Sequence, residues 1–283
     1  MLKLPSSWQT DWQFEDFFKV LESLEGEVFR EKDGRRTFRY SLEGKSCFIK
    51  MHRGVGWRNI FKALFRLRLP VLSAKNEWMA IERLTGLGVD TMKLVGYGIR
   101  GCNPARLRSF VITEDLSHTI SLEDYCRQWK NVPPPPRLKR ALIKKVAGIS
   151  RVLHENGINH RDYYICHFLL DVSTAVDTFE KPPPLYLIDL HRVQVRKRLP
   201  RRWRVKDIAG LYFSSMGLGL TQRDLLRFIR EYRPKSLRRS LEEDRLFWKS
   251  VRKKGMAGHR EFVRKYPHAA EDVPREEIER AAQ

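Results

Sequence analysis

The sequence predicts an α+β protein with two lobes, in which a small antiparallel sheet with one helix precedes a mainly helical half. Between Glu27 and Met51, short β-rich runs alternate with turn residues. A helical pattern then covers Ala74 to Leu87, and a longer amphipathic one covers Leu138 to about Glu155. Strand signals dominate the first third of the chain and helical signals dominate the rest, which is why two lobes are expected.

Turn residues divide the start of the smaller lobe into three strands. The runs EVFRE, RTFRYSLE and SCFIKM are separated by Lys32-Asp33-Gly34 and by Gly44-Lys45. Aspartate before glycine between such runs is typical of a hairpin, so we predict an antiparallel meander. Further strand-like runs at Lys93 to Gly98 and Ser109 to Glu114 extend the sheet.

The helix predicted between these strands has Trp78, Ile81 and Leu84 at helical spacing, and Gly86 near its end. Before it, residues 53–69 form a basic amphipathic insertion. Residues 1–116 are therefore assigned to the N-terminal lobe.

Prolines and a change in composition organise the second half. The run Pro133 to Pro136 cannot lie inside a helix and precedes the long helix from Leu138. A short apolar strand, Leu185 to Asp189, is followed by helices from Lys206 to Ser215 and beyond. We assign 117–238 to a helical lobe. Residues 239–283 are charged and helix-prone with little apolar periodicity, and they are predicted to form a surface helix or loose tail.

Composition argues against a zinc site, a disulfide framework and a membrane-spanning protein. The chain has 283 residues, 42% of them hydrophobic, and a formal net charge of +21. So positive a surface attracts phosphate-bearing partners, but charge alone does not choose among nucleic acid, anionic membrane and phosphorylated glycolipid. Four scattered cysteines form no C-x-x-C pair, and no apolar run is long enough to span a membrane. We expect a cytoplasmic protein whose membrane contact is peripheral.

Four residues that could serve phosphoryl transfer from ATP occur in the order in which a protein kinase has them. Lys50 ends the run Phe48-Ile-Lys50 and could hold the α- and β-phosphates, with Glu77 on the next helix as its partner. Asp162 lies in His160-Arg161-Asp162, where an aspartate would accept or orient the proton of the attacking hydroxyl. Asp189, at a strand end, is the candidate magnesium ligand. Each could be a surface or turn residue alone, but the ordered set predicts a bilobal protein-kinase-like fold that uses ATP and Mg²⁺.

Three departures from the protein-kinase pattern argue against a peptide substrate. The loop expected to cover the nucleotide lacks G-x-G-x-x-G and offers Gly34 followed by Arg35 and Arg36, so Arg35 is a candidate phosphate contact. His167 replaces the asparagine five residues after the catalytic aspartate. Imidazole is a poorer magnesium ligand than oxygen, which leaves metal binding and a hydrogen-bonding or packing role both open. Asp189-Leu-His-Arg192 replaces D-F-G, and no A-P-E triplet follows.

Basic clusters indicate an anionic acceptor. Between Arg53 and Leu69, aromatic and aliphatic residues fall at helical spacing while Arg58, Lys62 and Arg66 lie four residues apart. Such a helix either lies in a membrane interface or packs its apolar face on the protein. The segment from Arg192 to Lys206 holds eight basic residues and no acidic one. The candidate substrate-binding residues are Arg161, Arg192, Arg196 and Arg198.

At these residues the chain resembles a known family, the lipopolysaccharide core heptose kinases of Gram-negative bacteria, the WaaP group within the Kdo/WaaP kinases. The resemblance rests on INHRDYYICHFLL and LIDLHR around the two aspartates. It extends to FIKMHRGVGW, LPVLSAKNEW and PPPPRLKRAL. These strings lie between roughly Glu27 and Tyr232. Tyr163 stands where relatives often carry cysteine, and it is expected to matter little.

The resemblance implies ATP-dependent phosphorylation of a hydroxyl on the first heptose of the inner core. It makes Asp162 the catalytic base, Lys50 and Asp189 the nucleotide and metal contacts, and Glu77 the residue that orients Lys50. Glu114 to Leu116 would be the hinge that offers backbone groups to adenine.

Two alternatives stay open at this point. One is a kinase of another core sugar, such as Kdo or the second heptose. The other is a non-catalytic kinase-fold module whose basic surface binds nucleic acid or membrane. Retention of Asp162 and Asp189 argues against the second, and so does the single aromatic, Trp203, in the basic run, so nucleic acid is not an expected partner. The positive charge also makes a small acidic protein, such as an acyl carrier protein, a candidate partner.

Overall fold

The computed structural model describes residues 1–4, 16–32, 34–42, 44–65, 70–173 and 183–266, and it confirms the predicted α+β class. Two compact units are present. The first unit comprises Met1–Ser117 together with Asp189–Arg192, and the second unit comprises His118–Ile188 together with the chain from Val193 onward. The chain thus passes from the first unit to the second after Ser117.

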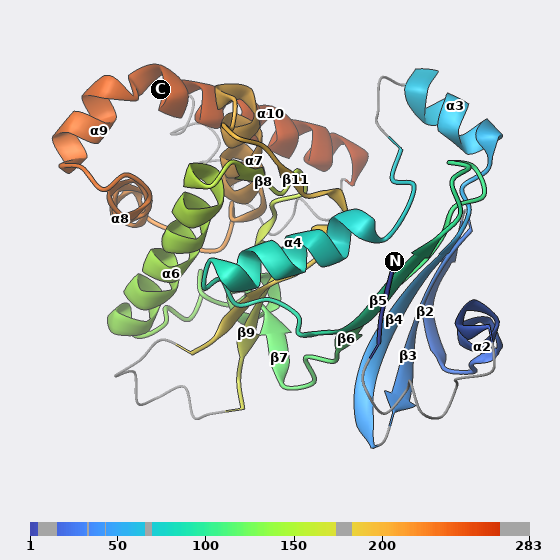
Figure 1. The fold of residues 1–283 in the computed structure, drawn as a ribbon. Helices are drawn as coiled ribbons and strands as arrows, with labels where there is room; N and C mark the ends of the chain where they lie inside the picture. Colours follow the sequence, from blue (N-terminus) through green and yellow to red (C-terminus); the bar gives the residue numbers. More distant parts are fainter. Residues whose placement is uncertain (5–15, 33, 43, 66–69, 174–182, 267–283) are drawn as a thin grey trace. The chain divides into compact units, whose positions relative to one another are not determined.

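A six-stranded antiparallel sheet forms the first unit (Figure 1). The three strands predicted between Glu27 and Met51 are confirmed, and glycines with positive φ, Gly34 at 73° and Gly44 at 74°, lie in the two turns between them. Asp33 of the first predicted turn lies outside the described residues. In spatial order the strands are β1 (Leu2–Lys3), β5 (Leu94–Arg100), β6 (Arg108–Glu114), β4 (Lys45–Arg53), β3 (Arg35–Leu42) and β2 (Glu27–Lys32).

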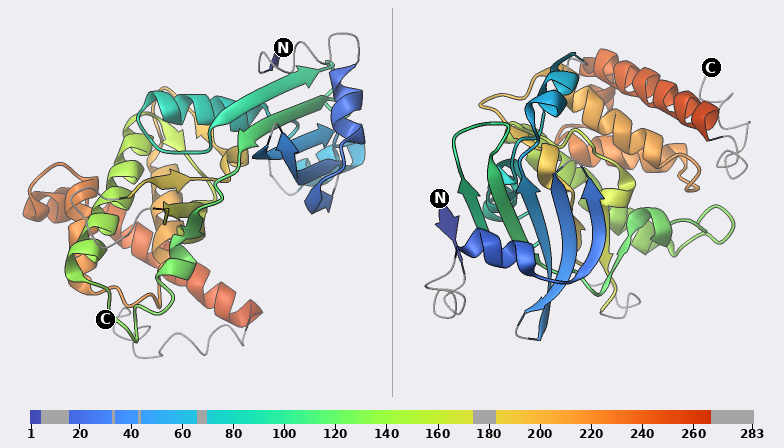
Figure 2. Two further views of the ribbon diagram at one scale, coloured as in Figure 1. Left: turned by 90° about the horizontal axis from the view of Figure 1, so that it is seen from below. Right: turned by 90° about the vertical axis from the view of Figure 1, so that its right-hand side faces the viewer.

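Helix α2 (Phe17–Ser23), which the sequence pattern did not predict, covers one face of this sheet (Figure 2, right). Its aromatic side chains are buried, and the ring of Phe110 lies 5.1 Å from that of Phe17 and 5.4 Å from that of Phe18. Asp16 caps the helix by accepting a hydrogen bond from Phe18 N at 3.2 Å. The apolar side chains of β3, β4 and β6 that face α2 therefore form the core of this unit.

Helix α4 (Lys75–Gly86) lies where the pattern of Trp78, Ile81 and Leu84 predicted it, and these three side chains are buried. The Trp78 ring stacks on that of Tyr97 in β5, with centroids 4.7 Å apart. Because successive side chains of β4 point to opposite faces, Ile49 and Met51 join the α2 core while Lys50 points the other way.

Helix α3 (Trp57–Phe65) lies within the predicted 53–69 insertion. It begins later than predicted because β4 continues to Arg53 and two glycines, Gly54 and Gly56, follow with positive φ. Ile60 is its buried residue. Residues 66–69 of the predicted segment, Arg66 among them, lie outside the described residues.

Helices dominate the second unit. Two small antiparallel sheets accompany them, and a 3₁₀ turn, η1, follows the His-Arg-Asp triplet. The helices are α5 (Leu122–Tyr125), α6 (Pro136–Glu155), α7 (Arg201–Ser214), α8 (Gln222–Tyr232), α9 (Leu237–Glu243) and α10 (Arg245–Lys265). The strands are β7 (Thr119–Ser121), β8 (Ile158–Asn159), β9 (Phe168–Asp171), β10 (Leu185–Leu187) and β11 (Gln194–Val195), and η1 spans Ile165–His167.

Two helix predictions in this unit need correction. Helix α7 begins at Arg201 and not at Lys206, because Pro200 is extended and acts as its N-cap. From residue 239 up to Tyr266, the chain is helical and packed within the second unit, and it is not a loose tail. Phe247, Val251 and Met256 are buried, and α10 lies beside α7 (Figure 1).

The close approach of α10 to α7 depends on a small residue. A Cβ atom at Gly255 would lie 2.6 Å from the Tyr212 ring and 3.2 Å from the carbonyl oxygen of Ala209. The buried residues of α10 fall at helical spacing, but the charged residues between them hid this pattern. These buried residues are Phe247, Val251, Gly255, Met256 and His259. Among the described residues, no helix is long and apolar enough to cross a membrane.

Candidate active site

An ion pair at the centre of the first unit joins β4 to α4. Lys50 Nζ lies 2.5 Å from Glu77 Oε1, and Glu77 is only 1% exposed. Burial alone would lower the pKa of Lys50, but attraction to Glu77 and then to Asp189 outweighs burial and raises that pKa. The ammonium group therefore stays charged, as a contact for phosphate must.

Asp189 belongs to the same unit through the 3₁₀ turn η2 (Leu190–Arg192). Its φ of 62° is unusual for a residue with a side chain. The Asp189 Oδ1 atom accepts a hydrogen bond from His191 Nδ1 at 2.5 Å, which orients the carboxylate. Such backbone strain gathers at functional sites, and here it falls on the residue predicted to bind magnesium.

Sequence patterns did not single out His52, two residues after Lys50 on the same face of β4. Burial, and then the charges of Arg35, His191 and Lys50, lower the pKa of His52 to about 3. It is therefore neutral at pH 7, chiefly because it is buried. Arg35, the predicted phosphate contact, donates from Nη2 to the carbonyl oxygen of Val71 at 2.7 Å. Arg35 and Lys50 are thus two cations of the first unit that could contact a polyphosphate.

The loop of the second unit that carries Asp162, the predicted catalytic base, is held by a residue that sequence reasoning missed. Asp207, buried in α7, accepts from His160 N at 2.7 Å and from Arg161 N at 2.9 Å. Arg161 has a φ of 77°, which a side chain strongly disfavours. The two hydrogen bonds to one carboxylate therefore stabilise the strained backbone that precedes Asp162. Asp207 lies 45 residues downstream of Asp162 in the chain, so no local motif joins them.

His167 closes the same loop. Its Nδ1 atom donates to the carbonyl oxygen of Asp162 at 2.7 Å, and this acceptor defines the tautomer. Its ring also stacks on that of His160 at 5.9 Å, and His160 in turn donates from Nε2 to the carbonyl oxygen of Ile188 at 2.9 Å. The structure thus displays the hydrogen-bonding role for His167, and only Nε2 could serve a metal ion.

Tyr163, expected to matter little, is part of the core. Its side chain is buried, and its hydroxyl oxygen lies 2.8 Å from the Ser150 hydroxyl oxygen. Burial raises the pKa of Tyr163, so the hydroxyl stays protonated. Its ring packs 5.2 Å from that of Phe168.

Residues Glu114 to Leu116 lie at the end of β6, immediately before the chain enters the second unit. The segment is anchored on both sides: Glu114 N donates to the carbonyl oxygen of Lys93 at 2.9 Å, and Asp115 N donates to that of Ser46 at 3.0 Å. That this segment is a hinge that offers backbone groups to adenine stays a prediction.

The structure gathers the predicted residues into two groups. Lys50, Glu77, Arg35 and Asp189 lie in the first unit together with Arg192, and Asp162 and His167 lie in the second. Among the predicted substrate-binding residues, Arg161 and Arg196 come together over the ring of Trp203, at 5.7 Å and 5.4 Å. Arg198 is exposed and lies outside this cluster.

A magnesium ion would need help from the nucleotide. Within the described part of the chain, no group of three or more His, Cys, Asp or Glu side chains could hold a metal. Mg²⁺ is usually bound by one or two carboxylates together with substrate phosphates and water. One carboxylate, Asp189, in a cationic environment therefore fits an ion that arrives with ATP better than a resident metal centre.

Comparison with known proteins decides the family. Residues 19–232 match the family model described as "Lipopolysaccharide kinase (Kdo/WaaP) family". This chain belongs to that family. A lipopolysaccharide core heptose(I) kinase WaaP of Escherichia coli K12 is 51% identical over 254 residues, which cover 89% of this chain and 95% of the relative. Its counterpart in Pseudomonas aeruginosa is 49% identical over 245 residues, covering 86% and 90%.

A solved structure entitled "WaaP in complex with acyl carrier protein" matches with a TM-score of 0.79 and 43% identity. The match covers 90% of this chain and 98% of that one. The chain is therefore a phosphotransferase of the Kdo/WaaP family with a kinase-like fold, and its departures from the protein-kinase motifs occur in a family whose members act on lipopolysaccharide.

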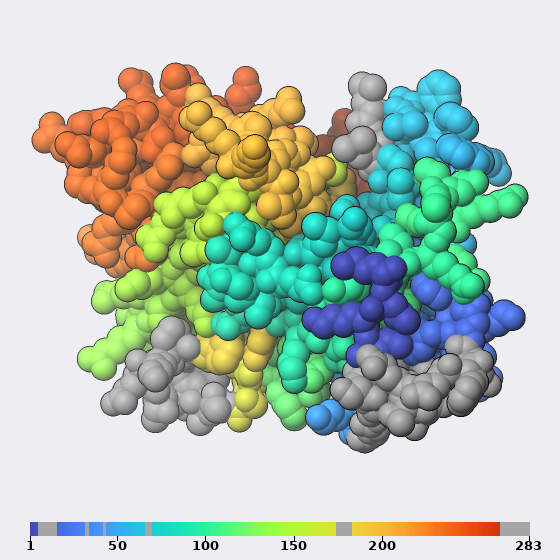
Figure 3. Space-filling view, in the orientation of Figure 1, coloured from blue at the N-terminus to red at the C-terminus, as the bar shows by residue number. Residues whose placement is uncertain are grey.

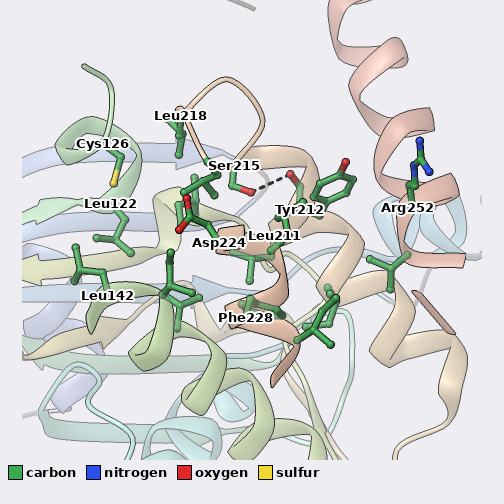
Figure 4. A pocket seen from close by; sticks show the side chains of 18 of the residues that line it. Leu122, Cys126, Leu142, Leu211, Tyr212, Ser215, Leu218, Asp224, Phe228 and Arg252 are labelled. Atoms are coloured by element: carbon green, nitrogen blue, oxygen red, sulfur yellow. Dashed lines mark hydrogen bonds between the residues drawn. The ribbon is translucent and has the colours of Figure 1, made fainter. Parts of the chain in front are cut away.

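A second feature of this Kdo/WaaP kinase is an apolar cavity of about 270 Å³ in the second unit (Figure 4). Side chains from α5, α6, α7, α8 and α10 line it, including Leu122, Leu142, Leu211 and Phe228. Asp224 supplies a charge at its wall. Burial would raise the pKa of Asp224, but hydrogen bonds from Thr221 and Lys139 outweigh it and lower that pKa to about 2.

We expect Asp207→Asn to lower kcat for phosphoryl transfer by roughly 10²-fold or more, because an amide NH₂ cannot accept from a backbone N–H and the loop around Asp162 shifts. The KM for ATP should change little. Steady-state kinetics on the purified variant measure both.

Asp244→Asn is the matched control, since it also removes one carboxylate from an ion pair, with Arg233 Nε at 3.0 Å, but away from the loop. Equal losses of kcat in the two variants, or none in Asp207→Asn, would show that Asp207 does not position the catalytic loop.

Proposed function

We propose that this protein transfers the γ-phosphoryl group of ATP to a hydroxyl of the first heptose of the lipopolysaccharide inner core. The observation that carries the proposal is the strained loop before Asp162, held by Asp207, in a chain about half identical to two heptose(I) kinases over nearly its full length. Binding modules need no such loop, which favours an enzyme over the non-catalytic alternative.

In this proposal each residue has one task. Lys50, oriented by Glu77, contacts the α- and β-phosphates, and Arg35 covers the phosphates. Asp189 holds magnesium, which neutralises charge on the transferred group when it is bound. Asp162 accepts or orients the proton of the attacking hydroxyl. Backbone groups of Glu114 to Leu116 contact adenine.

The substrate side is assigned to basic residues. Arg161, Arg192, Arg196 and Arg198 contact the acceptor, whose acidic groups attract guanidinium. A kinase of Kdo or of the second heptose is the competing assignment within the same reaction class, because the catalytic residues define the reaction more closely than the acceptor.

The test is transfer from labelled ATP to core glycolipid that lacks the heptose phosphate. Wild-type protein should phosphorylate the first heptose, and Asp162→Ala should lower the rate by about 10²- to 10⁴-fold because general-base catalysis is lost. Asp244→Ala, away from the loop, is the control for a lost carboxylate. Mass spectrometry that places the phosphate on another sugar, or undiminished transfer by Asp162→Ala, would refute the assignment.

We further propose that α3 brings the enzyme to an anionic membrane surface. Trp57 is 51% exposed, Phe61 53% and Phe65 88%, although all three are large and aromatic. Arg58 and Lys62 lie one turn apart on the same helix, which Figure 3 shows at the molecular surface. Exposed aromatic residues beside basic ones are what a helix in the membrane interface requires. Membrane contact would bring the enzyme to its proposed acceptor, because that acceptor is a glycolipid.

Sedimentation with lipid vesicles tests this contact. Phe61→Ser combined with Phe65→Ser should lower partitioning onto vesicles with anionic lipid by about tenfold or more, because two buried aromatic rings are lost from the interface. Leu246→Ser, which changes a residue 67% exposed on α10, is the control. Unchanged partitioning of the double variant would exclude α3 as the contact.

An acyl carrier protein is the proposed protein partner. The solved relative was captured with one, and the charge of +21 complements a small acidic protein. The cavity lined by Leu122, Leu142, Leu211 and Phe228 is apolar enough to receive an acyl chain from such a partner.

Calorimetry with acylated and unacylated acyl carrier protein tests both parts. We expect the acylated form to bind at least about tenfold more tightly, since each buried CH₂ contributes about 0.8 kcal/mol. Both affinities should fall with added salt. Equal affinity of the two forms would show that the cavity does not bind the acyl chain. No binding of either form would refute acyl carrier protein as the partner.

A further inference from the structure

Four cationic side chains surround one aromatic ring in the second unit. The guanidinium carbons of Arg161, Arg196 and Arg202 lie 5.7, 5.4 and 5.4 Å from the centroid of the Trp203 ring, and Lys206 Nζ lies 5.9 Å from it. We call these five residues the Trp203 cluster. They come from the catalytic loop, the end of β11 and the first turns of α7.

Backbone geometry brings Arg196 to this place. Strands β8 and β11 pair antiparallel, and Arg196 N donates to the carbonyl oxygen of Gly157 at 3.0 Å. Gly157 has a φ of 74°, and a Cβ atom there would lie 1.8 Å from the Arg196 carbonyl oxygen. The two strands therefore approach so closely only because residue 157 is glycine.

Neutral groups hold the side chain of Arg196. Its guanidinium donates to Asn159 Oδ1, and to Gln194 Oε1 at 2.5 Å. Amide oxygens orient a guanidinium without neutralising it. Arg202 has no ion-pair partner among the residues that the structure describes, and its side chain is exposed. Positive charge therefore accumulates at the Trp203 cluster.

Two further features strengthen this positive potential. The Trp203 cluster includes the first turns of the 14-residue helix α7, and no side chain caps that end. Free N–H groups and the helix dipole favour an anion there. The ring of Trp203 offsets part of the repulsion among the cations, but it does not remove their charge.

The segment around Trp203, residues 190–206, supplies no anionic side chain of its own. Between residues 189 and 211 the sequence contains no serine, threonine or tyrosine, so no phosphorylated side chain of that segment could occupy the cluster. The same stretch contains no acidic residue between Asp189 and Asp207. Asp207 is itself held by the backbone of His160 and Arg161.

We propose that the Trp203 cluster binds an anionic group, a carboxylate or a phosphate, carried by the acceptor on a sugar beside the one that is phosphorylated. The inference rests on the proposed kinase function. Arg161 directly precedes Asp162, so an anion held at the cluster places the neighbouring hydroxyl near the catalytic carboxylate. The cluster selects acidic saccharides over neutral ones, and it is a binding site that acts mainly on acceptor affinity.

The test combines Arg196→Gln with Arg202→Gln and measures transfer to intact core glycolipid. We expect the KM for the acceptor to rise by about tenfold or more, because two charge-assisted contacts are lost, with kcat and the KM for ATP within about twofold of wild type. The control, Lys253→Gln with Lys254→Gln, removes the same charge from exposed positions of α10 and should leave all three constants unchanged. An unchanged acceptor KM in the first variant overturns the proposal.

Two modified acceptors identify the anion. Reducing the carboxyl groups of the glycolipid, or removing its phosphates, should raise the wild-type KM only when the missing group is the one bound at the cluster. With that acceptor the Arg196/Arg202 variant should then be no worse than wild type. If neither modification changes the wild-type KM, the acceptor does not place an anion at the cluster.

A binding measurement that needs no phosphoryl transfer distinguishes the anion site at the Trp203 cluster from the proposed kinase function. Inorganic phosphate, added to protein already saturated with a non-hydrolysable ATP analogue, should raise the melting temperature of wild type and not that of the double variant. Failure of wild-type protein to phosphorylate any core glycolipid would refute the kinase proposal alone. Equal stabilisation of wild type and the double variant by phosphate would refute the anion site alone.

Discussion

The His160-Arg161-Asp162 loop of the second unit depends on one buried carboxylate. Asp207 accepts two backbone hydrogen bonds from His160 and Arg161, and without them the positive φ of Arg161 would cost of order 1–3 kcal/mol with nothing to offset it. Leaving a buried carboxylate without partners would be equally unfavourable, so the loop and α7 stabilise each other. The direction of the Arg161 side chain, the position of Asp162 and the start of the Trp203 cluster all follow from this pair of bonds.

In the first unit, the main constraint is the positive charge of Lys50, which needs a partner inside the folded lobe. Glu77 is nearly inaccessible, and its pairing with Lys50 outweighs the burial that would otherwise lower the pKa of Lys50. His52, on the same face of β4, is neutral instead: burial, and then the nearby charges, lower its pKa to about 3. The alternation of side chains along β4 decides which residues lie beside Lys50, since every second position faces the α2 core instead.

Part of the charge of +21 thus gathers in three groups of basic residues, and we propose a different kind of anion for each. Lys50 and Arg35 lie where phosphates of a nucleotide are proposed to bind. Arg58 and Lys62 accompany exposed aromatic residues on α3, as a lipid surface requires. Arg161, Arg196, Arg202 and Lys206 surround Trp203 beside the catalytic loop. A kinase whose acceptor is an acidic glycolipid at a membrane needs all three, whereas a kinase of neutral soluble sugars needs only the first.

Sequence alone determined the α+β class, the strands of the first unit, helices α4 and α6, and the family with its ordered set of Lys50, Glu77, Asp162 and Asp189. These depend on local signals: turn glycines, apolar periodicity, and short motifs whose chemistry is carried by adjacent residues. Tertiary structure decided what depends on contacts between distant residues. It placed Asp207 under the catalytic loop, made Tyr163 a core residue, packed α10 on α7 through Gly255, and brought four basic side chains to Trp203. No periodicity or motif records such contacts, because the partners are separated by many residues and meet only when β8, β11 and α7 have folded together.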